Sequence, residues 1–166
     1  MPGSDVFADV LGANASFAHG FSLGRLEARA AKGLAVLTCM DSRIDPLRLL
    51  GLSPGDAKIL RNAGGRVTDD VLRTLVLAVY LLGVERIMVV AHTRCRMAGG
   101  TEESVHRDIA AAGGPDTRSM AFLTTTDQHA SLRADVQRVH SSPYLQGVAV
   151  GGFVYDLDTG RLQPVC

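Results

Sequence analysis

The chain has 166 residues, enough for one domain whose core needs no disulfides. Lys plus Arg and Asp plus Glu both number 17, and this zero formal net charge argues against a partner such as nucleic acid or an acidic membrane. Hydrophobic residues make up 46% of the chain, and we expect part of this surplus to cover a contact between subunits.

The N-terminal stretch differs from a secretion signal. Its first ten residues, MPGSDVFADV, carry acids where a signal peptide has a basic start. The longest purely apolar run, VLAVYLL, is much too short to span a bilayer. We therefore expect a cytoplasmic protein without membrane contact. The loose helical spacing of apolar positions over residues 5–18 predicts a short helix within an N-terminal arm, residues 1–30.

Strands and helices are predicted to alternate from residue 34 onward. The apolar run 34–38 has the composition of a strand buried on both faces. Asp45 followed by Pro46 predicts the start of a short helix over residues 46–50. Residues 57–61 then predict a second strand, which ends in a glycine turn.

A long helix is predicted over residues 69–82. Thr68 precedes two acids that favour the helix dipole, and Gly83 provides the stop. Apolar residues line most of its circumference, so we expect this helix to be buried on two sides. A single chain cannot cover that much apolar surface.

The rest of the chain completes an α/β pattern. Residues 86–93 predict a third buried strand, and residues 101–112 and 128–140 have helical patterns. The last segment alternates like a strand and turns at residues 158–160. The predicted fold is a mainly parallel β-sheet flanked by helices, with a C-terminal antiparallel strand or hairpin, in a single domain over residues 1–166.

Chemically reactive side chains follow each predicted strand. Cys39 comes just after the first strand, the turn 62–65 after the second, and His92 with Cys95 at the end of the third. Ligand sites in parallel sheets lie beyond the carboxyl ends of the strands, so we expect these segments to meet at one edge.

Cys39, His92 and Cys95 together are a donor set suited to zinc. Three cysteines in a reducing compartment argue against a disulfide framework and leave metal binding or catalysis as specialised uses. Two thiolates and an imidazole match the ligands that tetrahedral zinc prefers. Asp41 is the nearby candidate for a fourth ligand, and Arg43 competes for its carboxylate. Cys166 is expected to be a frayed, free thiol.

Three segments, CMDSR, RNAGGRVTDDVLRTL and HTRC, resemble in order and separation the C-x-D-x-R, N-A-G and H-x-x-C motifs of the β-class carbonic anhydrases. The terminal GFVYDLDTGRL is similar to the last strand and hairpin of that family, and the short chain resembles its compact bacterial branch. The resemblance implies a zinc enzyme that reversibly hydrates carbon dioxide to bicarbonate by zinc-bound hydroxide, as a homodimer or homotetramer.

The same resemblance implies roles for individual residues. Cys39, His92 and Cys95 would be the zinc ligands, and Asp41 with Arg43 the catalytic pair. The family implies two states, one with Asp41 on zinc and the site shut, the other with Asp41 on Arg43 and a water in the fourth position.

Two features of these motifs leave alternatives open. Gly64 and Gly65 either contact substrate or form a plain tight turn. The family segment commonly reads H-T-D-C-G, whereas Arg94 and Arg96 replace the acid and the last glycine here. Loss of that glycine matters if the backbone needs a positive φ, and the two cations either assist anion binding or face a partner subunit.

Two other functions fit the same residues. One is hydrolysis of carbonyl sulfide or carbon disulfide at the same metal site, which the shape of the pocket would decide. The other is a non-catalytic, zinc-stabilised interaction protein in which Asp41 never leaves the metal.

Overall fold

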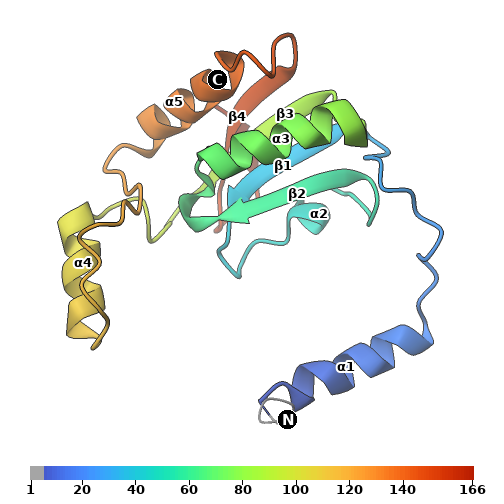
Figure 1. The fold of residues 1–166 in the computed structure, drawn as a ribbon, viewed down its shortest axis with the longest axis horizontal. Helices are drawn as coiled ribbons and strands as arrows, with labels where there is room; N and C mark the ends of the chain where they lie inside the picture. The colour runs from blue at the N-terminus through green and yellow to red at the C-terminus, as the bar shows by residue number, and fades with distance from the viewer. Residues whose placement is uncertain (1–5) are drawn as a thin grey trace.

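A five-stranded sheet with the order β2-β1-β3-β4-β5 forms the centre of the molecule (Figure 1). The computed structural model describes residues 6–166. Strands β1 to β4 are mutually parallel, and β5 pairs antiparallel with β4, which confirms the predicted sheet. The strands are β1 (Leu34–Cys39), β2 (Ala57–Asn62), β3 (Arg86–His92), β4 (Ala149–Tyr155) and β5 (Leu162–Pro164).

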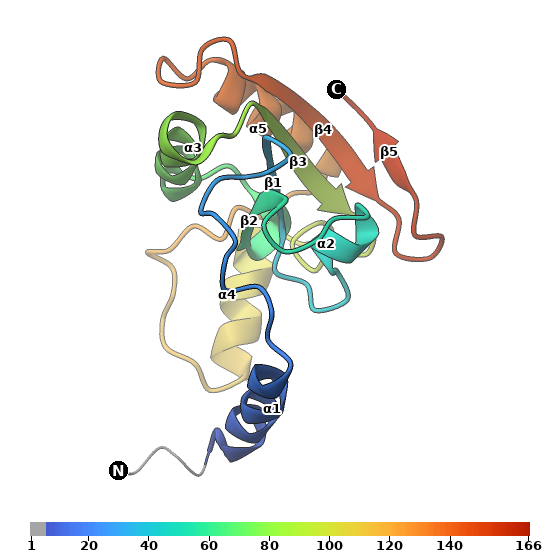
Figure 2. The same cartoon turned by 90° about the vertical axis from the view of Figure 1, so that its right-hand side faces the viewer.

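Helices flank this sheet on both faces. Figure 2 shows α3 and α5 on one side of the sheet and α2 on the other. Between β2 and α3 lies the short 3-10 turn η1 (Ala63–Gly65). The helices are α1 (Ala8–His19), α2 (Pro46–Leu49), α3 (Asp69–Leu82), α4 (Glu102–Ala111) and α5 (Gln128–His140).

Strand β1 supplies side chains to two hydrophobic clusters, one on each face of the sheet. Ala35 and Leu37 pack in the cluster that contains the buried residues of α3 and α5. Leu34 and Val36 pack in the opposite cluster, where side chains from the end of α2 and from β4 join them. Every residue of β1 is buried, which explains why its sequence is a continuous apolar run without alternation.

Caps mark the start of α2 and the end of α3 where the sequence predicts them. The Asp45 side chain accepts a hydrogen bond from Arg48 N at 3.2 Å, with Pro46 in the first turn of α2. Gly83 ends α3 in the left-handed conformation, with φ of 73°. Strands β1 and β2 each run one residue further than predicted, because Cys39 and Asn62 still pair in register.

Two apolar surfaces of the chain remain uncovered. None of the residues of α1 is buried, and the helix stands away from the sheet (Figures 1 and 2). The predicted N-terminal arm therefore holds a helix, although its residues 1–5 lie outside the described part. A single chain leaves part of α3 uncovered, as its apolar circumference predicts, since Leu77, Tyr80 and Leu81 are exposed. Among residues 6–166, no helix combines the length and apolar composition needed to cross a membrane.

Candidate metal centre

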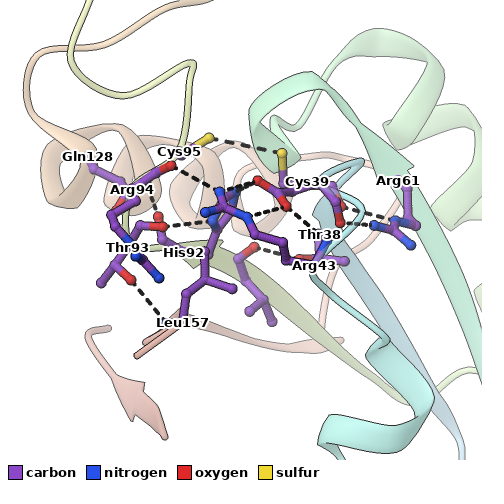
Figure 3. A network of polar contacts seen from close by, with 12 residues as sticks. Thr38, Cys39, Arg43, Arg61, His92, Thr93, Arg94, Cys95, Gln128 and Leu157 are labelled. Atoms are coloured by element: carbon purple, nitrogen blue, oxygen red, sulfur yellow. Dashed lines mark hydrogen bonds and ion pairs between the residues drawn. The ribbon is translucent and has the colours of Figure 1, made fainter. Parts of the chain in front are cut away.

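Three potential metal donors converge at the carboxyl edge of the sheet. Cys39 is the last residue of β1, His92 is the last residue of the adjacent strand β3, and Cys95 follows in the next turn. One donor atom from each residue lies within 4.8 Å of the other two, and the two sulfur atoms are 3.9 Å apart (Figure 3). All three side chains are buried. The expected meeting of these strand ends is thus present in the structure.

The chemistry of these donors fits a zinc ion. His92 Nδ1 lies 2.9 Å from the carbonyl oxygen of Thr93, and within residues 6–166 no group forms a hydrogen bond with its buried Nε2. A buried nitrogen without a hydrogen bond costs roughly 1–3 kcal/mol, a penalty that a coordinated metal removes. Burial lowers the pKa of His92, so the imidazole stays neutral, as a ligand must be. Burial also raises the pKa of the Cys95 thiol, so a bound cation has to displace its proton.

Asp41 and Arg43 form a close ion pair beside these donors. Arg43 Nε donates to Asp41 Oδ1 at 2.9 Å and Arg43 Nη2 donates to Oδ2 at 2.6 Å, while the Arg43 backbone N–H donates to Oδ1 at 3.0 Å. These hydrogen bonds hold the pKa of Asp41 far below its ordinary value, so the carboxylate is ionised. Asp41 Oδ2 lies 3.9 Å from His92 Nε2. Of the two arrangements expected, the structure contains the one in which Asp41 pairs with Arg43.

In the turn between His92 and Cys95, the residue with a left-handed backbone conformation is Arg94. The φ angle of Arg94 is 55°, whereas Arg96 is not among the residues with positive φ. Loss of the family glycine at position 96 is therefore compatible with this backbone. The carbonyl oxygen of Arg94 accepts a hydrogen bond of 3.2 Å from Arg43 Nη2, which connects the turn to the ion pair.

Both arginines of the turn find partners within the chain. Arg94 pairs with Asp158 of the C-terminal hairpin at 2.9 Å, and Arg96 pairs with Asp108 of α4 at 2.5 Å. Both side chains remain exposed, by 55% and 70%, so anion binding and contact with another subunit stay predictions. The partners are 64 and 12 residues away in sequence, and nothing in the motif points to them.

The glycine turn η1 packs directly against the ligand strand. Gly64 and Gly65 have φ angles of 79° and 65°. A Cβ atom on Gly65 would lie 3.1 Å from the backbone N of Cys39, too close for an ordinary contact. This geometry explains the glycines as parts of a tight turn, and their contact with substrate stays a prediction.

Several residues around the donors have no signal in the sequence. Gln128 Nε2 donates to the carbonyl oxygen of His92 at 3.0 Å, and Arg61 binds the backbone beside Cys39. Buried Asp135 accepts from Arg66 Nε at 2.6 Å across 69 positions of sequence. A small cavity beside Cys95 is lined by Gly64, Met97, Leu123, Gln128 and Asp135, among others.

Cys166 differs from the expectation of a frayed terminus. Its carbonyl oxygen accepts a hydrogen bond of 2.7 Å from Gly152 N in β4, so the terminus is attached to the sheet. Its thiol is free, as expected.

Comparison with known proteins places this architecture in a family. The carbonic anhydrase family model matches residues 34–162. Beta-carbonic anhydrase 1 of Mycobacterium tuberculosis is 35% identical over 160 residues, which cover 95% of this chain and 96% of the relative. A carbon disulfide hydrolase of Acidianus sp. is 33% identical over 156 residues, which cover 78% of this chain and 76% of the relative. The crystal structure of carbonic anhydrase from Streptococcus mutans superposes with a TM-score of 0.88 at 37% identity, covering 96% and 97% of the two chains. With the C-x-D-x-R, N-A-G and H-x-x-C segments meeting at one sheet edge, the chain belongs to the β class of the carbonic anhydrase family.

Proposed function

We propose that this zinc enzyme catalyses the reversible hydration of carbon dioxide to bicarbonate, with Cys39, His92 and Cys95 as ligands and Asp41 and Arg43 as the catalytic pair. The observation that carries the proposal is the buried donor cluster with an ionised carboxylate 3.9 Å from one of its donors. A zinc ion held there would lower the pKa of a water molecule and so supply a hydroxide nucleophile near neutral pH.

Asp41 orients the nucleophile as a hydrogen-bond acceptor. An ionised carboxylate has no proton to donate, so it accepts the O–H of the attacking oxygen and leaves a lone pair of that oxygen free for the carbon of carbon dioxide. Arg43 fixes both carboxylate oxygens, and the Arg94 carbonyl holds the guanidinium in turn. A carboxylate released from Arg43 would be near enough to compete for the metal, so the guanidinium would also keep Asp41 away from the ion.

The catalytic roles are tested with Arg43→Ala. We expect this variant to keep one zinc per chain and to lose at least about 100-fold in carbon dioxide hydration, because Asp41 is no longer held in place. Arg73→Ala is the matched control, since it removes an exposed arginine that also pairs with a nearby aspartate. Wild-type turnover in Arg43→Ala would refute the role assigned to the pair.

The ligand assignment is tested by metal analysis. Cys95→Ser should no longer retain stoichiometric zinc, whereas Cys166→Ser, which removes the remaining thiol outside the cluster, should retain it. Stoichiometric zinc in Cys95→Ser would contradict this ligand set.

Hydrolysis of carbon disulfide or carbonyl sulfide is the second candidate, because a carbon disulfide hydrolase is among the similar proteins. These linear molecules suit the same nucleophile. Parallel assays of carbon dioxide, carbonyl sulfide and carbon disulfide on zinc-loaded protein identify the preferred substrate. If all three assays fail on protein with full zinc content, the chain is a non-catalytic zinc protein.

We further propose that residues 1–166 form a single domain that assembles as a homodimer or homotetramer in the cytoplasm. The uncovered apolar residues of α1 and α3 support the assembly. Metal binding requires Cys39 and Cys95 as free thiols, which a reducing compartment preserves, and this requirement supports the location.

A further inference from the structure

Arg61 lies on β2 and contacts the backbone at the exit of the neighbouring ligand strand. Its Nε donates to the carbonyl oxygen of Cys39 at 3.0 Å, and its Nη2 donates to the carbonyl oxygen of Asp41 at 2.6 Å (Figure 3). A single guanidinium therefore joins the backbone of a metal-binding cysteine to the backbone of the aspartate that orients the nucleophile.

Arg61 binds the chain at the point where the hydrogen bonding between β1 and β2 ends. The pairing of β1 with β2 ends at Cys39 and Asn62, and Met40 N donates to Asn62 O at 2.9 Å directly beyond it. Asp41 has already left the sheet. The planar fork of an arginine suits two neighbouring acceptors, whereas a lysine presents a single flexible ammonium.

The contacts of Arg61 also distinguish this role from that of a surface ion pair. Among residues 6–166, no carboxylate forms a salt bridge with Arg61. The two carbonyl oxygens are its hydrogen-bond acceptors in this region. Its position is therefore explained by the backbone that it binds.

We propose that Arg61 is a positioning residue that fixes the Asp41 backbone relative to Cys39, and so fixes the Asp41 carboxylate at Arg43 beside the metal donors. The inference rests on the proposed function. Arg43 binds the carboxylate itself, while Arg61 holds the main chain from which that carboxylate extends. Without Arg61, the segment after β1 can move, and a misplacement of about 1 Å in a reacting group costs up to about 100-fold in rate.

The test compares Arg61→Ala and Arg61→Lys with Lys58→Ala as matched control. Lys58 is a cation on the same strand, but its Nζ donates to the carbonyl oxygen of Ala28 and not to the segment that follows β1. Each variant is analysed for metal content, for kcat and KM, and for the visible spectrum of its cobalt(II)-substituted form at one fixed pH. The spectrum responds to the ligands around the ion without requiring turnover.

We expect Arg61→Ala to bind one metal per chain, to lose roughly 10–100-fold in kcat, and to change its cobalt spectrum toward that of Arg43→Ala. Arg61→Lys should be intermediate, because it can restore one of the two hydrogen bonds. Added guanidinium ion should restore part of the kcat of Arg61→Ala and leave Lys58→Ala, which should behave as wild type, unchanged.

Three results would overturn the proposal. One is a wild-type kcat and cobalt spectrum in Arg61→Ala. Another is loss of the metal from both Arg61 variants, which would make Arg61 part of the framework of the ligands instead of a positioner of Asp41. The third is an equal loss of kcat in Lys58→Ala. If Arg61→Ala fails to fold, Arg61→Lys decides between these outcomes.

Failure of the wild-type protein to hydrate carbon dioxide would refute the proposed function, while the cobalt spectra would still report the placement of Asp41.

Discussion

Arg94 has an unfavourable backbone conformation at a position that serves the candidate site. Its φ of 55° lies in the left-handed region, which disfavours residues with a Cβ by roughly 1–2 kcal/mol. In return, the carbonyl oxygen of Arg94 accepts a hydrogen bond from the Arg43 guanidinium. The strain is therefore located in the turn that joins two metal donors, where it supports the Asp41–Arg43 pair.

Substitutions at Arg94 should separate backbone strain from side-chain charge. Asn tolerates the left-handed region, so Arg94→Asn should stabilise the protein by up to about 1 kcal/mol, or roughly 2–4 °C in melting temperature. Arg94→Val should destabilise it by at least about 1 kcal/mol, because β-branched residues resist positive φ. Arg96→Asn is the control, since it also loses an exposed ion pair but has no positive φ to relieve. Equal melting temperatures for Arg94→Asn and Arg94→Val would show that the turn stores no such strain.

The charge of Asp41 sets an expectation for pH dependence. Its pKa is lowered in the folded state by Arg43, so the stability from this pair is present above the unfolded pKa, about 4, and is lost as pH falls through the lower folded value. Between about pH 6 and 9 the carboxylate keeps its charge. Activity should therefore follow ionisation of the attacking water and rise toward alkaline pH.

A pH profile of kcat/KM from carbon dioxide hydration checks this expectation. The rise should persist in Arg73→Ala, whose substitution lies on the exposed surface of α3. Highest activity in acid would show that another titrating group controls the reaction.

At the level of residues, the sequence predicted the donors but not the groups that hold them. Cys39, His92 and Cys95 could be found because each follows an apolar strand, and parallel strand ends converge. Arg61 could not be found, because its acceptors are backbone carbonyls, which every residue carries. Asp135 could not be paired with Arg66, because no periodicity connects positions on a turn and a distant helix.

At the level of elements, a partly buried ion pair connects Asp135 of α5 to Arg66, which directly follows the glycine turn. The Asp135 side chain is 7% exposed, and Arg66 also donates to the carbonyl oxygen of Leu123 at 2.8 Å. One guanidinium thus joins α5, η1 and the loop before α5, all of which line the cavity beside Cys95.

Breaking this pair should be more damaging than breaking an exposed one. Asp135→Ala removes the carboxylate partner of the partly buried Arg66 guanidinium and should cost roughly 1.5–3 kcal/mol of stability. Asp116→Ala is the comparison, because Asp116 makes a similarly short pair with Arg118 on the surface, where such pairs contribute at most about 1 kcal/mol. Chemical denaturation of both variants measures the difference, and a similar loss in each would argue against a structural role for the Asp135–Arg66 pair.

The elements themselves were predictable wherever local signals agreed. Thr68 and Gly83 marked both ends of α3, and continuous apolar runs marked β1 and β3. The sequence predicts two-sided burial of α3, but hydrophobicity around a helix does not show whether the covering surface belongs to the same molecule. Exposed Leu77 and Tyr80 illustrate this ambiguity.

At the level of the whole molecule, α1 requires an explanation of its stability. It has 12 residues, a length at which an isolated helix is marginal in water, and none of them is buried. Phe17 and Leu11 on this helix are exposed by 62% and 58%. Packing against a second copy would supply the missing contacts.

Sedimentation should therefore give a dimer or larger assembly, and deletion of residues 1–20 should weaken it. Substituting Lys for Leu81 on the exposed side of α3 tests the second uncovered surface in the same way. The matched control is Arg73→Ala, an exposed polar position on the same helix. A species of 17.6 kDa from the full chain at micromolar concentration would contradict the proposed assembly.

The placement of the donors has a consequence for the order in which the protein assembles. β1 and β3 are neighbouring interior strands, each hydrogen-bonded on both sides, so the sheet holds Cys39 and His92 whether or not an ion is bound. Folding should then precede metal loading, unlike in zinc fingers, which unfold when the ion is removed. Protein stripped by a chelator should keep its far-UV circular dichroism and a cooperative melting transition, and should release protons when zinc is returned. Unfolding on chelation would instead mean that the ion, and not the sheet, builds the site.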